Sequence, residues 1–264
     1  MGPRRDSGSL EARLAALEEA TDLADGRLAP ADVAGARAVV ERAGHRLGFG
    51  LEPTVTALAG ATGSGKSSLF NALAQRHLAA VGVRRPTTGR AQACVWGGAA
   101  SEALLDWVGA QDRHRLGGDP RLDGLVLLDL PDHDSTDESH RIEVDRLVEL
   151  VDLLVWVVDP QKYADAALHE RYLKPLATHA RVMLVVLNHA DELDADGLDA
   201  CLVDLRRLLD SHGLEDVRIL ATSALTGDGV DALRAELAAR VAARRTSIER
   251  LEADAARVTT ALAA

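Results

Sequence analysis

A glycine-rich loop with one lysine is the clearest chemical feature of this sequence. Residues 60–67 read GATGSGKS, which fits the pattern G-x-x-x-x-G-K-[ST] and directly follows the apolar run VTALA. Glycines let the backbone wrap closely, so that successive N–H groups and the start of the next helix face an anion. Lys66 adds a positive charge, and the Ser67 hydroxyl offers an oxygen ligand to Mg²⁺. The loop predicts a nucleotide-phosphate site lined by Gly60, Thr62, Gly63, Ser64, Gly65, Lys66, Ser67 and Ser68.

Three further polar motifs follow apolar runs that are typical of buried strands. Asp129 follows the first run, in LVLLDLPDH. Asn188 and Asp191 follow the second, in VMLVVLNHAD, and Ser223 and Ala224 follow the third, in ILATSAL. Open parallel sheets hold their ligands at this edge. A carboxylate there can hold Mg²⁺. An aspartate three residues after an asparagine can accept hydrogen bonds from the N1–H and 2-amino groups of guanine, a donor pair that adenine lacks.

The order of these motifs resembles that of the translation-factor-related GTPases, particularly the Era/TrmE-like branch and the bacterial YfjP-like, ribosome-binding-type GTPases. The resemblance covers about residues 53–245 and includes the threonine pair of RRPTTGR. It implies GTP or GDP as ligand and switch segments around 80–90 and 130–140. It also implies Mg²⁺ ligands and base contacts: Ser67, Thr88 (favoured over Thr87) and Asp129 for Mg²⁺, and Asn188, Asp191 and the Ser223-Ala224 backbone for guanine.

Three departures from the family pattern bear on activity. Asp132 stands where D-x-x-G has its glycine, and a carboxylate beside the γ-phosphate weakens switching or hydrolysis. His133 follows it, in the place of a residue that orients the attacking water, so it joins Lys66 and Thr88 as a catalytic candidate; the alternative is a surface histidine. His189 replaces the lysine of N-K-x-D, and its flat ring is expected to stack along the base.

The spacing of the elements predicts the fold class. From Val55 onward, short apolar runs alternate with helical segments, as expected for a parallel α/β sheet covered by helices on both faces. The resemblance implies, more specifically, the three-layer architecture of a small-GTPase-like P-loop domain with a mostly parallel sheet. Residues 91–96 are a further expected strand, and helices are expected over 66–78 and 164–179. A short helix is expected within SEALLDWVGA, in a segment whose place in the fold the pattern leaves open.

Helices flank this domain on both sides. Leucines at helical spacing predict a helix over 9–24, and a second begins near Pro30. Residues 231–264 read as one long helix whose end needs a partner, so we predict that it packs on the first two; the alternative is an exposed or oligomerising helix. The expected domains are a helical pair at 1–50, a GTPase domain at 51–245 and a C-terminal extension at 246–264.

Composition and charge limit the classes of partner that we expect this chain to bind. The net charge of −11 argues against a general basic surface, so no direct DNA binding is expected. The longest apolar runs, of about six residues, are far shorter than the ~20 that cross a membrane, so a cytoplasmic protein is expected, with peripheral membrane association if the full protein is longer. The remaining expectations are core positions for Cys94, Cys201, Trp96, Trp107 and Trp156, and a solvated helix face for Arg244 and Arg245.

The expected function is that of a Mg²⁺-dependent GTP-binding protein that hydrolyses GTP slowly to GDP and phosphate and acts as a switch. Two alternatives stay open. One is a catalytically weak guanine-nucleotide-binding scaffold, and the other is the G domain of a longer dynamin-like, membrane-associated GTPase. The expected partners besides the nucleotide are an effector protein or the ribosome, and a second copy of the chain in a nucleotide-dependent dimer.

Overall fold

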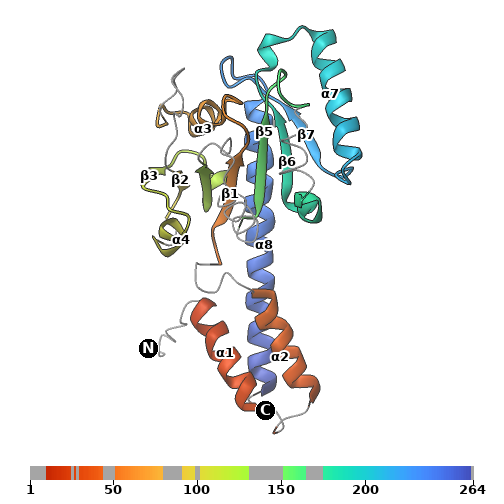
Figure 1. The fold of residues 1–264 in the computed structure, drawn as a ribbon. Coiled ribbons are helices and arrows are strands. Elements are labelled where there is room, and N and C mark those ends of the chain that lie inside the picture. Colours follow the sequence, from red (N-terminus) through yellow and green to blue (C-terminus); the bar gives the residue numbers. More distant parts are fainter. Residues whose placement is uncertain are drawn as a thin grey trace.

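The computed structural model describes residues 10–24, 27, 30–43, 51–79, 91–98, 102–130, 151–164 and 175–262. A seven-stranded sheet with helices on both faces forms one end of the molecule. Three helices form the other end (Figure 1). None of the helices in these ranges is both long enough and apolar enough to cross a membrane.

The sheet is mixed and mostly parallel, with strand order β3-β2-β4-β1-β5-β6-β7. Among the strand pairs in the described ranges, only β2–β4 is antiparallel. Strands β1, β4, β5 and β6 are buried along their whole length because both faces are covered, which explains their continuous apolar sequences. The predicted α/β P-loop fold is confirmed. The strands are β1 (Thr54–Ala59), β2 (Gln92–Trp96), β3 (Asp112–Leu116), β4 (Leu125–Asp129), β5 (Leu153–Val158), β6 (Met183–Leu187) and β7 (Arg218–Ala221).

Helices cover both faces of the sheet. On one face, α3 (Lys66–Ala74) and the first half of α8 (Val230–Leu262) bury Phe70, Leu233 and Leu237 against the sheet. On the other face, α4 (Glu102–Trp107) and α7 (Ala195–Asp210) bury leucines of their own. Short 3-10 helices lie at Pro120–Leu122, Pro175–Val182 and Ala190–Glu192.

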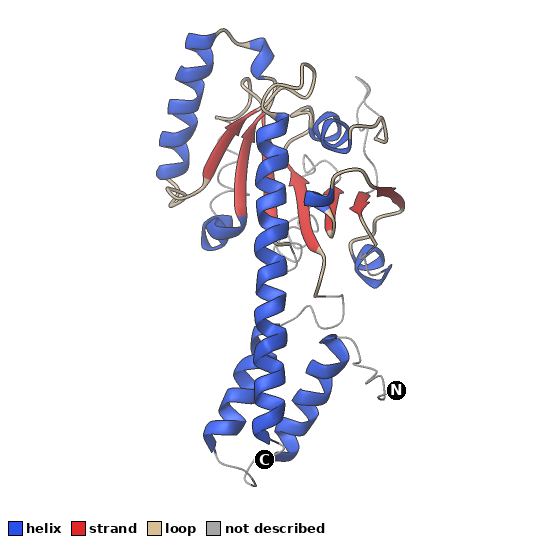
Figure 2. Cartoon of the chain, turned by 180° about the vertical axis from the view of Figure 1, so that it is seen from behind, coloured by secondary structure: helices blue, strands red, loops and turns tan. Residues whose placement is uncertain are grey.

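Besides the hydrophobic cores on the two faces of the sheet, a third core lies away from the sheet. It is formed by α1 (Leu10–Ala24), α2 (Pro30–Ala43) and the far half of α8. Figure 2 shows α8 running from the sheet to a position between the other two helices. Leucines of α1 meet Val39 of α2 and Leu251 of α8 in this core. Because α8 is continuous over 33 residues, it has no break at residue 245.

The structure departs from the sequence-based expectations at several points. The helix expected over 66–78 ends at Ala74, because Gln75 takes a left-handed conformation with φ 54°. Residues 165–174 lie outside the described ranges, and 175–182 form a kinked 3-10 helix rather than the end of an α-helix. Strand β3 was not predicted. Trp107 is 41% exposed and is not a core residue, whereas Trp96, Trp156 and both cysteines are buried as predicted.

Candidate functional site

The loop between β1 and α3 can only be built with glycine at two of its positions. Gly60 has φ 145°, and a Cβ there would lie 2.1 Å from the Val157 carbonyl oxygen of β5. Gly65 has φ 84°, and its Cβ would lie 2.2 Å from Asn188 Nδ2. Both positive φ values disfavour other residues. The loop is therefore held tightly between β5 and the segment that follows β6.

Lys66, the first residue of α3, is buried beneath this loop. Its Nζ donates hydrogen bonds to Gly60 O at 2.7 Å and to Ala61 O at 3.1 Å. The ammonium group thus lies on the inner side of the loop, at the N-terminus of a helix that itself favours anions. Loop and lysine have the arrangement that phosphate binding requires.

Ser67 and Asp129 come together at the same edge of the sheet. Ser67 Oγ donates to Asp129 Oδ2 at 2.7 Å, and Asp129 is fully buried at the carboxyl end of β4. A hydroxyl and a carboxylate are the hard oxygen ligands that Mg²⁺ prefers, so these two residues fit the ion. No cluster of three or more His, Cys, Asp or Glu side chains suited to a metal occurs within the described ranges. Mg²⁺ at such a site commonly takes further ligands from substrate phosphates and water.

Asn188 joins three loops. Its Nδ2 donates to Ser64 O of the phosphate loop at 3.0 Å. Its Oδ1 accepts from Thr222 Oγ1 at 3.2 Å and from the Ala224 N–H at 3.1 Å, both in the segment after β7. The side chain is fully buried. Its amide therefore sets the position of the phosphate loop relative to the two later loops.

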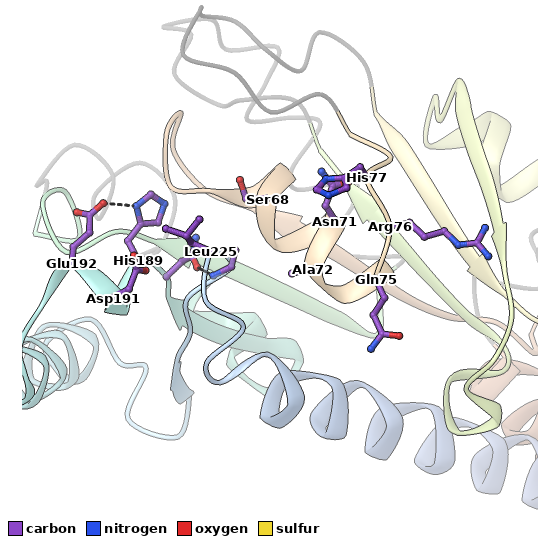
Figure 3. A pocket seen from close by; sticks show the side chains of 12 residues that line it. Ser68, Asn71, Ala72, Gln75, Arg76, His77, His189, Asp191, Glu192 and Leu225 are labelled. Carbon is purple, nitrogen blue, oxygen red and sulfur yellow. Dashed lines mark hydrogen bonds and ion pairs between the residues drawn. The ribbon is translucent and has the colours of Figure 1, made fainter.

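A cavity of about 550 Å³ opens beside these loops. Figure 3 shows residues of α3, among them Ser68 and Ala72, on one side, and His189, Asp191 and Leu225 on the other. Asp191 is exposed and lines the cavity, so its carboxylate is accessible to a ligand. The lining residues are Ser68, Asn71, Ala72, Gln75, Arg76, His77, Asn188, His189, Asp191, Glu192, Ala224 and Leu225.

His189 lies between the cavity and the phosphate loop. It takes a left-handed conformation with φ 62°, and its Nε2 would be 2.7 Å from a Cβ at Gly65. Its Nδ1 is 3.0 Å from Glu192 Oε1, the interaction drawn in Figure 3. The imidazole plane is thus held at one edge by a carboxylate.

Ser223 and Ala224 differ in their roles in the local structure. Ser223 is buried, and its Oγ accepts from the Thr226 N–H at 3.0 Å, which shapes the turn before α8. Ala224 lines the cavity with its backbone amide held by Asn188. Gly63 has φ 85°, Thr62 and Ser64 are buried, and all three remain within the phosphate loop.

Several expected site residues lie outside the described ranges. These are Thr88 with its neighbour Thr87, Asp132 and His133, all from the two segments expected to switch. The entry to the first segment is described: Asn71 Oδ1 accepts from the Leu78 and Ala79 N–H groups, and its Nδ2 donates to Ala79 O, each at 2.8 Å. Asn71 therefore fixes the chain just before residue 80.

Sequence reasoning missed Asn71, Glu192 and Lys162. Asn71 is a buried polar residue in a helix whose other buried residues are mostly apolar, and that exception in the pattern was the available signal. Glu192 stands three residues after His189, a spacing that places both in one helical turn. Lys162 donates to Thr62 O of the phosphate loop at 3.1 Å, and no local pattern indicates that contact.

Burial raises the pKa of the Cys94 thiol to about 12, with a smaller contribution from the nearby Asp129 carboxylate. Cys94 lies on β2, which pairs with β4 next to the site. The thiol therefore stays protonated and acts as an apolar neighbour of the site.

A strand, a glycine-rich loop and a helix at the edge of a mostly parallel sheet, followed by buried Asp129 and by Asn188, define a P-loop GTPase domain. The chain belongs to the 50S ribosome-binding GTPase family, whose sequence model matches residues 55–189, about half of the chain. The domain is therefore a GTP-binding GTPase domain. No curated protein sequence matches the chain.

Solved structures share the fold at low identity. A chain of an oligomerised bacterial dynamin pair matches with TM-score 0.56 and 13% identity over 96% of this chain and 46% of its own. Era from Aquifex aeolicus bound to GDP·AlF4⁻ matches with a TM-score of 0.52 and 18% identity, over 72% of this chain and 57% of its own. Toc33 from Arabidopsis thaliana matches with a TM-score of 0.51 and 12% identity, over 82% of this chain and 94% of its own. The chain thus spans about half the length of the dynamin chain that it matches.

Proposed function

We propose that this chain binds GTP with Mg²⁺ and hydrolyses it slowly to GDP and phosphate, acting as a nucleotide-dependent switch. The observation that carries the proposal is the cavity in which the exposed Asp191 lies beside a phosphate loop that Asn188 holds in place. A carboxylate at that position suits the adjacent N1–H and 2-amino donors of guanine.

In this proposal the phosphates bind to the loop from Gly60 to Gly65 and to Lys66. The loop N–H groups and the ammonium stabilise negative charge as water attacks the γ-phosphate in line, so that catalysis is mainly electrostatic positioning. Ser67, Asp129 and Thr88 would hold Mg²⁺, directly or through water, and the ion when bound would supply further neutralisation of the phosphate charge. His133 orients the attacking water.

The base lies in the cavity in this proposal. Asp191 accepts its two donors, and the His189 ring stacks along it in the orientation that Glu192 supports. The Ser223-Ala224 backbone borders the base, and Asn188 holds that backbone against the phosphate loop. The Asp132 carboxylate repels the γ-phosphate, which is why slow turnover is proposed.

A calorimetric titration of GDP, GTP and ADP with Mg²⁺ into nucleotide-free protein tests the proposal. Guanine nucleotides alone should bind, and Asp191→Asn should lose affinity for GDP and gain it for xanthosine diphosphate. Asp196→Asn is the matched control, because Asp196 is exposed in the first turn of α7 and does not line the cavity. Equal affinity for ADP and GDP would refute the base-reading role.

The rate of GTP hydrolysis distinguishes a switch from a scaffold that hydrolyses little GTP. Asp132 in the position of the family's glycine favours the scaffold alternative. Phosphate release is measured in a single turnover with protein in excess over GTP. An Asp132→Gly variant should hydrolyse faster than the natural chain, and His133→Ala should hydrolyse more slowly. An unchanged rate in His133→Ala would remove that residue from the mechanism.

A second candidate function is the G domain of a longer dynamin-like protein. It is favoured because the bacterial dynamin match covers 96% of this chain, and therefore includes helices at both of its ends. That dynamin pair is described as sensing and tethering membranes over long range. Co-sedimentation of a longer form with liposomes tests this candidate, and a form that stays in the supernatant with GTP present would contradict it.

The proposed partners are an effector protein or the ribosome, and a second copy of the chain. Toc33, which shares the fold, is described in terms of a dimerisation-deficient mutant. Light scattering with GDP and with a non-hydrolysable GTP analogue tests the nucleotide-dependent dimer. A cytoplasmic location is proposed with it.

A further inference from the structure

The turn after β5 lies against the phosphate loop and is anchored on both sides. The Gln161 N–H donates to Asp159 Oδ1 at 2.8 Å, and the Tyr163 N–H donates to Asp159 O at 3.0 Å. Tyr163 Oη then donates to Asp204 Oδ2 of α7 at 2.9 Å. The turn that carries Lys162 is therefore attached both to the end of β5 and to a helix on the sheet.

Lys162 extends from this turn to the phosphate loop. Its half-buried Nζ donates to Thr62 O at 3.1 Å, across 100 residues of sequence. Lys66 bonds the two preceding carbonyls, Gly60 O and Ala61 O. Two lysines from different elements thus hold three successive carbonyls of one loop.

The direction of these carbonyls matters for anion binding. A loop that cradles an anion must turn its N–H groups toward it, and a carbonyl oxygen turned the same way would repel it. A charged donor on the carbonyl stabilises its orientation more strongly than a neutral donor does. Lys162 makes this bond from outside the loop, so it does not need to leave Thr62 O when Lys66 engages a phosphate.

The use of lysine at this position is notable in the composition. Only three of the 30 basic residues are lysine, namely Lys66, Lys162 and Lys174. Lys162 also adds a positive charge near a site that already holds the Asp129, Asp159 and Asp191 carboxylates.

We propose that Lys162 is a positioning residue of the nucleotide site: by holding the Thr62 carbonyl it keeps the phosphate loop in its binding conformation. This inference rests on the proposed nucleotide binding but not on the proposed choice of base, because the loop contacts phosphates only. Its effect should therefore be the same on every ligand that carries a diphosphate.

The test compares Lys162→Met, which keeps the apolar stem without the donor, with Lys162→Arg, which keeps a charged donor of similar reach. Affinities for GDP, ADP and inorganic pyrophosphate with Mg²⁺ are measured by calorimetry on the full chain. Lys162→Met should weaken binding about tenfold for each ligand that the natural chain binds, and Lys162→Arg should stay within about threefold of the natural chain. Arg207→Met is the control for net charge, since Arg207 is 77% exposed on α7.

Two outcomes would overturn the proposal. Binding by Lys162→Met within twofold of the natural chain would show that the contact does not position the loop. A loss that Lys162→Arg does not restore would show a merely structural role. If Lys162→Met does not fold, Lys162→Gln, which is too short to reach Thr62 O, replaces it. If ADP binds as well as GDP, the base assignment fails, and the loss on ADP or pyrophosphate still decides the role of Lys162.

Discussion

At the scale of single residues, the site depends most on Asn188. Its amide takes one partner from the phosphate loop and two from the segment after β7, and burial excludes water as a replacement. A buried polar group that loses its partner costs more free energy than the intact bond contributes. Asn188 is thus important for the stability of the site as well as for ligand binding.

Replacing Asn188 by Ala should lower the free energy of unfolding by about 1–3 kcal/mol, because Ser64 O and the Ala224 N–H lose their buried partner. Nucleotide affinity should fall with it. Urea unfolding measures the first effect and calorimetry the second. Glu192→Gln is the comparison in the same loop: its contact is exposed, so stability should change by less than about 1 kcal/mol. Equal losses in the two variants would contradict this account.

The two cysteines carry a second prediction at this scale. Burial raises the pKa of Cys94 to about 12 and also raises that of Cys201, while the thiolate is the reactive form. A thiol reagent at pH 8 should therefore react slowly with the folded chain and quickly with two thiols in denaturant. One equivalent of fast reaction in the folded state would show that a cysteine is accessible.

At the scale of elements, two arginines of α8 attach the helix to α3 and to segments that flank strands of the sheet. Arg234 is buried and donates to Leu73 O at the end of α3 and to Asp119 Oδ2, the latter at 3.0 Å. Arg244 donates to Leu51 O at 3.0 Å and lies 3.8 Å from Asp152. The expectation of a solvated helix face is therefore wrong for Arg244, because the helix passes close to the entry of β1. It holds for the exposed Arg245.

The attachment of α8 through Arg234 depends on pH, because Asp119 is one of its partners. Its hydrogen bond with Arg121, and a second with Arg234, hold the pKa of the carboxyl below its ordinary value near 4. The charged carboxylate therefore stabilises the folded state above pH ~4, and this stabilisation is lost as the pH falls through the lowered pKa. Asp119→Asn should be less stable than the natural chain at pH 7, and the difference should shrink below pH ~4. Urea unfolding across this range tests it, with the exposed Asp199→Asn as control. A difference that does not change with pH would argue against the ion pairs.

At the scale of the whole molecule, two of the three hydrophobic cores share one helix, α8. Leu233, Leu237 and Val241 of α8 belong to the core between α3 and the sheet, and Leu251, Ala255 and Val258 belong to the core with α1 and α2. We propose that the helical pair and the end of α8 form a unit distinct from the GTPase domain, in keeping with the expected boundaries near 50 and 245. Figure 1 shows this unit on the far side of the molecule from α3.

Leu14→Ala tests the independence of that unit. Leu14 is fully buried in the core with α8, so its truncation should lower the free energy of unfolding by about 2–5 kcal/mol. Leu23→Ala on the same helix is the control, because Leu23 is 60% exposed. GDP affinity at 25 °C should stay within twofold in both variants. A tenfold loss of affinity in Leu14→Ala would show that the helical unit and the nucleotide site are coupled.

Local pattern determined most of the strands and which polar residues follow them. Continuous apolar runs predicted the buried strands, and GATGSGKS, Asp129 and the Asn188-Asp191 pair lie at the ends of strands as predicted, where they form the candidate site. These features depend on residues within a few positions of one another, so one sequence suffices to find them. Strand β3 escaped because an exposed edge strand reading DRHRL lacks the apolar run.

Only the tertiary structure decided which side chains meet. The bonds from Lys162 to Thr62, from Asn188 to Ser64 and from Arg244 to Leu51 cross 100, 124 and 193 residues of sequence. Nothing in the local spacing encodes them, because they arise where the packing of β5, β6 and α8 brings backbone groups within reach. The residue types set the chemistry of the phosphate loop, whereas the packing of distant elements sets the conformation in which that chemistry is available.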